Sequence, residues 1–119
     1  MTWPATLFPE ARDRLHELEA ELWAPGRLDP TILERCRARV AMLLGDDSVE
    51  QPQWPRTDEL DARTRACLAF AEQYVLDAHG VTDELCASLR AELTDAEAVA
   101  LTMAVATFDA TSRARIVLR

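Results

Sequence analysis

Lysine is absent from this sequence of 119 residues, and all 13 of its basic residues are arginines. Catalysis through a lysine Schiff base or a lysine nucleophile is therefore excluded, because both reactions need a side-chain amine. Glycine is also scarce, with three residues in the chain. No segment shows the alternation of apolar and polar residues that is typical of a strand. These absences favour a helical protein without lysine chemistry.

Long hydrophobic runs are missing as well. The longest nearly apolar stretch, Ala96 to Phe108, contains Glu97, Thr102 and Thr107, and it falls short of the ~20 residues that a membrane-spanning helix needs. The segment from Met1 to Pro4 has no basic region followed by an apolar one, as a secretory signal would have. We therefore expect a cytoplasmic protein with no membrane partner.

Cysteine and histidine are too few and too scattered for a disulfide framework or a metal site. Cys36, Cys67 and Cys86 are an odd number, lie far apart and fall in helical patterns, as buried free thiols do in a reducing compartment. His16 and His79 belong to different predicted helices and have no second histidine or cysteine four residues later. The sequence therefore predicts no metal ion and no cofactor.

The charge balance limits the partners of the protein. The formal net charge is −8 and the isoelectric point is about 4.7. Binding to nucleic acid relies instead on clustered cations. We expect neither nucleic acid nor an anionic membrane surface as a partner of this acidic protein.

The length and the apolar share of 49% suit a single globular domain, residues 1–119, with one core. Apolar residues recur at spacings of three and four, which is typical of amphipathic helices. Caps, prolines and glycines bound these patterns and predict five helices: Pro9 to Trp23, Asp29 to Gly45, Asp58 to His79, a short one opened by Thr82-Asp83-Glu84, and a last one from a capping box of Thr94 and Glu97 towards the C-terminus. The predicted fold class is all-α, a compact bundle of about five helices.

The second predicted helix has a basic side, formed by Arg35, Arg37 and Arg39. After it, prolines and small polar residues break the helical period from Gly45 to Arg56. We expect Trp54 in this connection to pack against the second and third helices, with its indole N–H bonded to a carboxylate or a carbonyl.

The last predicted helix is apolar on every side between Ala98 and Phe108, where an amphipathic surface helix would show one stripe. Either the other helices surround it within one subunit, or a second subunit covers its outer side. A small domain struggles to enclose one helix completely, so we expect both to contribute. The sequence thus predicts a homo-oligomer, or assembly with a related subunit, with this helix and its Val105 at or near the interface.

Two segments carry a resemblance to a known family. The first runs from Leu28 through Glu34-Arg35-Cys36-Arg37-Ala38-Arg39-Val40 to Gly45, and the second runs from Arg65 to Gln73 and is followed by Val81-Thr82-Asp83-Glu84. Together they resemble the carboxymuconolactone decarboxylase family, which includes the AhpD-like alkylhydroperoxidases. The resemblance covers about residues 28–119. It implies a compact, all-α, AhpD-like fold and association into dimers, trimers or hexamers.

Redox-active members of that family carry a Cys-x-x-Cys motif followed by His at the start of the next helix. Here Asp46-Asp47-Ser48-Val49 stands at the matching place, and Gln53 stands near that of the histidine. The peroxidase cycle needs two thiols that one helical turn brings together. The sequence therefore predicts a degenerate active site without peroxidase chemistry.

Three carboxylates remain as candidate catalytic residues. The resemblance implies that Glu34 matches a glutamate that relays protons to the first motif cysteine. Glu72 lies in a Phe-Ala-Glu-Gln stretch shared with the family, and Asp109 interrupts the last helix directly after its apolar run. Carboxylates that border apolar surface can line a ligand pocket, but they can equally form structural ion pairs. Arginines available for such pairs are Arg35, Arg37, Arg63, Arg65, Arg113 and Arg115.

Three functions are compatible with these observations. The first is a non-redox carboxymuconolactone decarboxylase-like (AhpD-like) protein, an oligomeric binding or scaffold domain that has lost peroxidase chemistry and can take a small-molecule ligand. The second is a cofactor-independent lyase or isomerase, in which Glu34, Glu72 or Asp109 acts as acid or base at a subunit interface. The third is a residual thiol peroxidase that uses Cys36.

Overall fold

A computed structural model describes residues 8–118 of the chain. The segment Met1 to Pro4, on which the expected lack of a secretory signal rests, lies outside these described residues. Five α-helices and no strand occur within them: α1 (Pro9–Leu22), α2 (Pro30–Leu44), α3 (Ala62–Leu76), α4 (Asp83–Glu92) and α5 (Asp95–Leu118). The predicted all-α class with about five helices is confirmed.

Local signals in the sequence explain where the first two helices begin and end. Pro9 stands at the first position of α1, where a missing backbone N–H costs no hydrogen bond. Asp29 caps α2, because its carboxylate accepts a hydrogen bond from the backbone N–H of Thr31 at 2.8 Å. Gly45 ends α2 with a φ of 78°, a left-handed conformation that glycine adopts without strain.

Helix α3 is shorter than the predicted span from Asp58 to His79. The two ends of that span form separate 3-10 turns, at Thr57–Glu59 and Ala78–Gly80. Asp61 caps α3 by accepting a hydrogen bond from the backbone N–H of Thr64, and Asp77 caps the second turn in the same way. The apolar period does not show where an aspartate side chain competes for backbone donors, so the prediction ran through both caps.

Thr94 and Glu97 form the predicted capping box at the start of α5. The Thr94 hydroxyl accepts from the N–H of Glu97 at 3.1 Å, and the Glu97 carboxylate accepts from the N–H of Thr94 at 3.0 Å. Arg63 on α3 also donates to Glu97, and this bond together with the cap lowers the pKa of Glu97 to about 2. The capping box therefore also ties α5 to α3.

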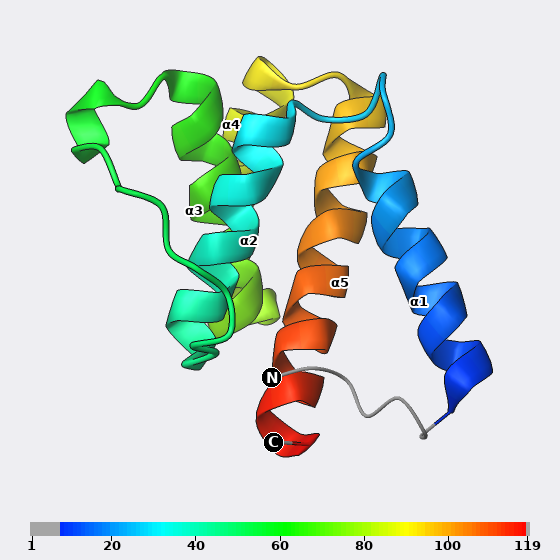
Figure 1. Ribbon diagram of the computed structural model, residues 1–119. Coiled ribbons are helices and arrows are strands. Elements are labelled where there is room, and N and C mark those ends of the chain that lie inside the picture. The colour runs from blue at the N-terminus through cyan, green and yellow to red at the C-terminus, as the bar shows by residue number, and fades with distance from the viewer. Residues whose placement is uncertain (1–7, 119) are drawn as a thin grey trace.

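Figure 1 shows α5 near the middle of the molecule, with α2, α3 and α4 on one side and α1 on the other. The connection between α2 and α3 runs back along α2, so these two helices pack side by side and run in the same direction (Figure 1). All five helices contribute to one apolar core, with Leu22, Leu33, Cys67, Leu89 and Leu101 as examples. No helix in the described part of the chain is long and apolar enough to cross a membrane.

Helix α5 divides its apolar residues between the core and the surface. Leu101, Ala104 and Val105 are fully buried within the subunit, whereas Val99 is 64% and Met103 is 49% exposed. Val105 is therefore a core residue, which corrects its predicted place at a subunit interface. The exposed apolar side of this helix lies at Val99 and Met103 instead.

Candidate functional site

Asp46 and Ser48 lie where the family resemblance expects a dithiol. Asp46 follows Gly45 and is 5% exposed. Its carboxylate accepts hydrogen bonds from the backbone N–H and the hydroxyl of Ser48, at 3.1 and 2.6 Å, and from Nε of Arg115 at 3.0 Å. Arg115 also donates to the hydroxyl of Ser112 at 3.4 Å. We call Asp46, Ser48, Ser112 and Arg115 the carboxylate clasp.

The carboxylate clasp keeps Asp46 ionised. Burial alone would raise the pKa of Asp46, but hydrogen bonds from Ser48, Ser112 and Arg115 outweigh it and lower the pKa to about 2. Such a carboxylate is a weak general base, because it has little affinity for a proton at neutral pH. The clasp joins the end of α2 to the last turns of α5, which is a structural role.

The thiols of Cys36 and Cys67 lie inside the core, on α2 and α3. Burial raises the pKa of Cys67 to about 11 and raises the pKa of Cys36 well above its usual range. Both groups are protonated at neutral pH, whereas the nucleophile in thiol chemistry is the thiolate. This finding disfavours the residual thiol peroxidase that would use Cys36.

Glu34 and Asp109 each form an ion pair on their own helix. Glu34 accepts from Nη2 of Arg37 at 2.9 Å, one turn along α2, and both side chains are partly exposed. Asp109 accepts from Nε of Arg113 at 3.0 Å, one turn along α5. Pairs at this spacing are common on helix surfaces and stabilise the helix by a few tenths of a kcal/mol, roughly 0.2–0.5.

Glu72 pairs with an arginine from another helix. Nη1 of Arg39 on α2 donates to the Glu72 carboxylate on α3, and the guanidinium of Arg39 also lies 4.4 Å from the centroid of the Trp54 ring. The second contact is a cation–π interaction, which is stronger where the cation is partly shielded from water. Arg39 is therefore held between Trp54, in the connection from α2 to α3, and Glu72 on α3.

Trp54 fastens the connection to α2. It packs against the edge of the core, and its indole Nε1 donates to the side-chain carbonyl of Gln51 at 3.0 Å. Nε2 of Gln51 in turn donates to the backbone carbonyl of Ala38 at 2.8 Å. The predicted contact of Trp54 with α2 and its bond to a carbonyl are confirmed, although the carbonyl belongs to a side chain of the same connection.

A cavity of about 360 Å³ opens beside the Arg39–Glu72 pair. It lies between α3 and the 3-10 turn at Thr57–Glu59, and Trp54 lies on the guanidinium that forms part of its wall. Its lining combines charged, hydroxyl and apolar groups: Arg39, Thr57, Leu60, Arg65, Leu68, Ala69 and Glu72. Of the three candidate carboxylates, Glu72 is the one that lines this cavity.

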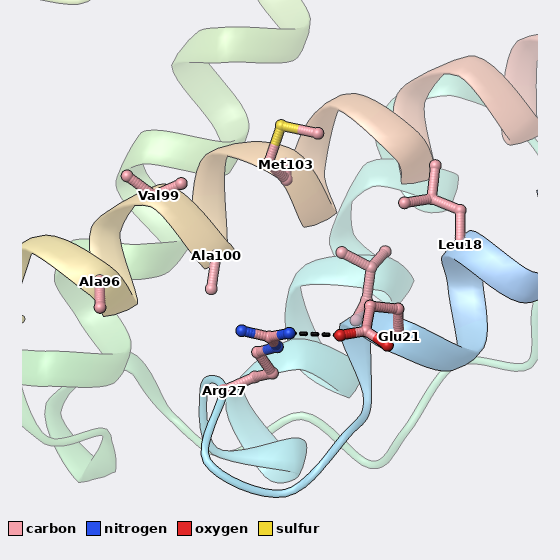
Figure 2. A pocket seen from close by; sticks show the side chains of 8 residues that line it. Leu18, Glu21, Arg27, Ala96, Val99, Ala100 and Met103 are labelled. Atoms are coloured by element: carbon pink, nitrogen blue, oxygen red, sulfur yellow. Dashed lines mark hydrogen bonds and ion pairs between the residues drawn. The ribbon is translucent and has the colours of Figure 1, made fainter.

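A second, apolar groove of about 240 Å³ lies between α1 and α5. Figure 2 shows Val99 and Met103 on α5 and Leu18 on α1 around it, with the ion pair of Arg27 and Glu21 at its edge. Leu18 is exposed, as are Val99 and Met103. The groove therefore continues the exposed apolar side of α5 onto α1.

The three candidate carboxylates form three separate ion pairs, with Arg37, Arg39 and Arg113. The structure thus pairs Glu72 with an arginine that the sequence did not single out as its partner. The basic side of the second predicted helix was the available signal for Arg39. Within residues 8–118 no cluster of three or more histidine, cysteine or acidic residues could hold a metal ion.

Comparisons with known proteins extend these observations. No protein-family model and no curated protein matches this chain. A solved structure of a protein from Agrobacterium tumefaciens has the same fold, with a TM-score of 0.80 and 20% sequence identity. The match covers 94% of this chain and 90% of that one. That protein is described as one of unknown function, with a suggested identity as the antioxidant defence protein AhpD. The AhpD-like fold that the resemblance implies is confirmed.

Proposed function

We propose that this chain is a non-redox member of the carboxymuconolactone decarboxylase family and acts as an oligomeric binding or scaffold domain. The AhpD-like fold and the family-like segments of α2 and α3 support the membership. The charged cavity beside Glu72 and the apolar groove beside Met103 supply surfaces for a small molecule and for another subunit. Neither surface needs a cofactor to bind a partner.

The carboxylate clasp is the observation that carries the loss of peroxidase chemistry. A peroxidatic thiol must be exposed to peroxide, ionised and close to a resolving thiol. At the matching place this chain has Asp46 and Ser48, bonded to each other and to Arg115. The position is occupied by a structural network, and the thiols of α2 and α3 are buried elsewhere.

An assay with hydrogen peroxide or an alkyl hydroperoxide and a dithiol reductant tests this proposal. We expect no turnover above the rate of the uncatalysed mixture, because no vicinal dithiol can complete the cycle. Cys36→Ser and Cys67→Ser should leave this background unchanged. Robust turnover that disappears in Cys36→Ser would contradict the proposal and restore the thiol peroxidase.

The apolar face of α1 and α5 supports the oligomer. Val99, Met103 and Leu18 together form exposed apolar surface around one groove. Monomeric proteins tend to keep such surface small, and contiguous patches commonly mark interfaces. We propose that a second copy of the chain covers this face, as the assemblies implied by the family resemblance would require.

The lyase or isomerase alternative receives less support. A general acid or base must be free to exchange a proton with a bound substrate. Glu34 and Asp109 are instead paired with arginines one turn away on their own helices. Of the three candidate carboxylates, Glu72 alone lines a described cavity, so catalysis by these candidates would depend on Glu72.

A further inference from the structure

Two opposite charges stand at the ends of one face of α3. Arg65, Leu68, Ala69 and Glu72 follow the spacing of residues that share a helix face, and all four line the same cavity. Arg65 and Glu72 are seven positions apart, which corresponds to ~10 Å along the helix axis. Long side chains at both ends can lean towards each other and shorten this span.

The acidic end of this face is held in place. The Oε1 atom of Glu72 accepts from Arg39, and Arg39 is held against Trp54, so the carboxylate is fixed before any ligand arrives. Glu72 remains 38% exposed, and no hydrogen bond from the described residues reaches its second oxygen. That oxygen can therefore accept a hydrogen bond from a ligand.

The basic end is free to bind an anion. Arg65 is exposed and forms no ion pair with any residue between 8 and 118. Its guanidinium presents paired N–H donors whose geometry matches a carboxylate. Between the two ends, the wall of the cavity consists of Leu60, Leu68 and Ala69. The cavity thus has a cationic end at Arg65, an apolar middle and, at its other end, the Arg39–Glu72 ion pair, in which one carboxylate oxygen has no donor among the described residues.

We propose that this cavity binds a linear zwitterion, with its carboxylate on Arg65, its ammonium group on Glu72 and an apolar chain across Leu68 and Ala69. This inference rests on the proposed binding role and names the class of ligand. A simple anion leaves the second oxygen of Glu72 without a donor, and a simple cation leaves Arg65 without an anion. A zwitterion of suitable length satisfies both ends.

A ligand series tests the proposal in the full-length protein. The probes are 6-aminohexanoate, its one-charge analogues hexanoate and hexylamine, and the short zwitterion glycine. The indole N–H resonance of Trp54, assigned with Trp54→Phe, reports on binding because Trp54 touches Arg39. We expect 6-aminohexanoate to bind about tenfold or more tightly than the other three, since each lacks one charge-assisted contact or the length to make both.

Matched variants assign the two ends. Arg65→Gln should weaken 6-aminohexanoate about tenfold and leave hexylamine binding unchanged, and Glu72→Gln should weaken 6-aminohexanoate without weakening hexanoate. Arg90→Gln, an exposed arginine on α4, is the control and should change nothing. A variant that only disturbed the structure would weaken all probes alike, so these selective losses indicate direct binding.

Several outcomes would overturn the site. Hexanoate that binds as tightly as 6-aminohexanoate would show an anion site, and equal binding of hexylamine would show a cation site. The absence of any shift at Trp54 or elsewhere up to the solubility of the probe would exclude the zwitterion. The peroxide assay and the subunit mass test the proposed function and do not depend on these binding experiments. Failure of the zwitterion site is therefore distinguishable from failure of the proposed function.

Discussion

Asp46 is a buried carboxylate that its neighbours hold in the ionised form. A buried carboxylate without partners would be costly, but Ser48, Ser112 and Arg115 supply donors around it. The pKa of Asp46 falls from 3.8 to about 2, so the folded state favours the ionised form. This preference contributes to stability above the unfolded pKa and is lost as the pH falls through the folded one.

We therefore predict that Asp46→Asn loses about 2 kcal/mol of unfolding free energy at pH 7, in keeping with a shift of that size. Urea denaturation at pH 7, 4 and 2.5 should show the deficit shrinking as the pH falls, because Asp46 takes up a proton in the unfolded wild-type chain before it does so in the folded one. Glu97 titrates in the same window, so the comparison is between variant and wild type. Asp58→Asn, in the exposed pair with Arg56, is the control and should lie within about 0.5 kcal/mol of wild type. Parallel pH profiles for Asp46→Asn and wild type would refute the role of the clasp.

Trp54 carries the second prediction at this scale. Trp54→Ala should cost about 2 kcal/mol, less than a fully buried aromatic residue, because its ring is only partly buried and also holds Arg39. Trp54→Phe, which keeps a ring face, should recover part of the loss. Thermal melts of the two variants measure this order. A melting temperature for Trp54→Ala equal to that of wild type would mean that the connection is not fastened by this residue.

Residue partners were harder to predict than residue types. The sequence marked Glu72 as an acid at the edge of an apolar face and suggested arginines for it, but its partner is Arg39, 33 positions earlier. The pairing depends on the parallel packing of α2 and α3, which the connection enforces. The apolar periodicity of one helix shows which of its own faces is buried, but it does not show which face of a neighbouring helix packs against it.

At the scale of helices, the capping residues determined how accurately the helix ends were predicted. Pro9, Asp29 and Gly45 placed the ends of α1 and α2 correctly, because each acts on its own backbone neighbours. Asp61 and Asp77 act in the same local way, yet they sit inside a continuous apolar pattern, so the limits of α3 were predicted too widely. The ends of a helix were predicted correctly where the apolar pattern and the capping residue pointed to the same position.

The capping box of α5 gives a prediction for an element. Thr94→Ala should destabilise the protein by about 1 kcal/mol, because the N–H of Glu97 loses its acceptor. Thr102→Ala is the matched control: that hydroxyl bonds back to the carbonyl of Ala98 in the exposed middle of the same helix, and its loss should cost almost nothing. Chemical denaturation midpoints would show the contrast, and equal midpoints for both variants would argue against the cap.

For the whole molecule, the question is what covers α5. The sequence showed that its apolar belt was too wide for one face, and the structure assigns Val105 to the core and Val99 and Met103 to the surface. A single sequence could not make that division, because it depends on where α1 and α2 lie around the helix.

The corresponding prediction concerns mass in solution. Wild-type protein should scatter light as an oligomer at micromolar concentration, and the double variant Val99→Glu, Met103→Glu should fall to the chain mass of 13.3 kDa with an unchanged helical spectrum. Leu76→Glu, at a residue 67% exposed at the end of α3, is the control and should keep the oligomer. A monomeric mass for the wild-type protein under these conditions would contradict the proposed interface.

The packing of α1 against α5 also matters while the chain is being made. Helix α5 is synthesised well after α1, so α1 cannot contact this partner until residues 23–118 have been added to the chain. At ordinary translation rates that delay is on the order of ten seconds, during which its leucines stay uncovered. We expect the solubility of the nascent helix in that interval to depend on the acidic residues interspersed among its leucines: Glu10, Asp13, Glu17, Glu19 and Glu21.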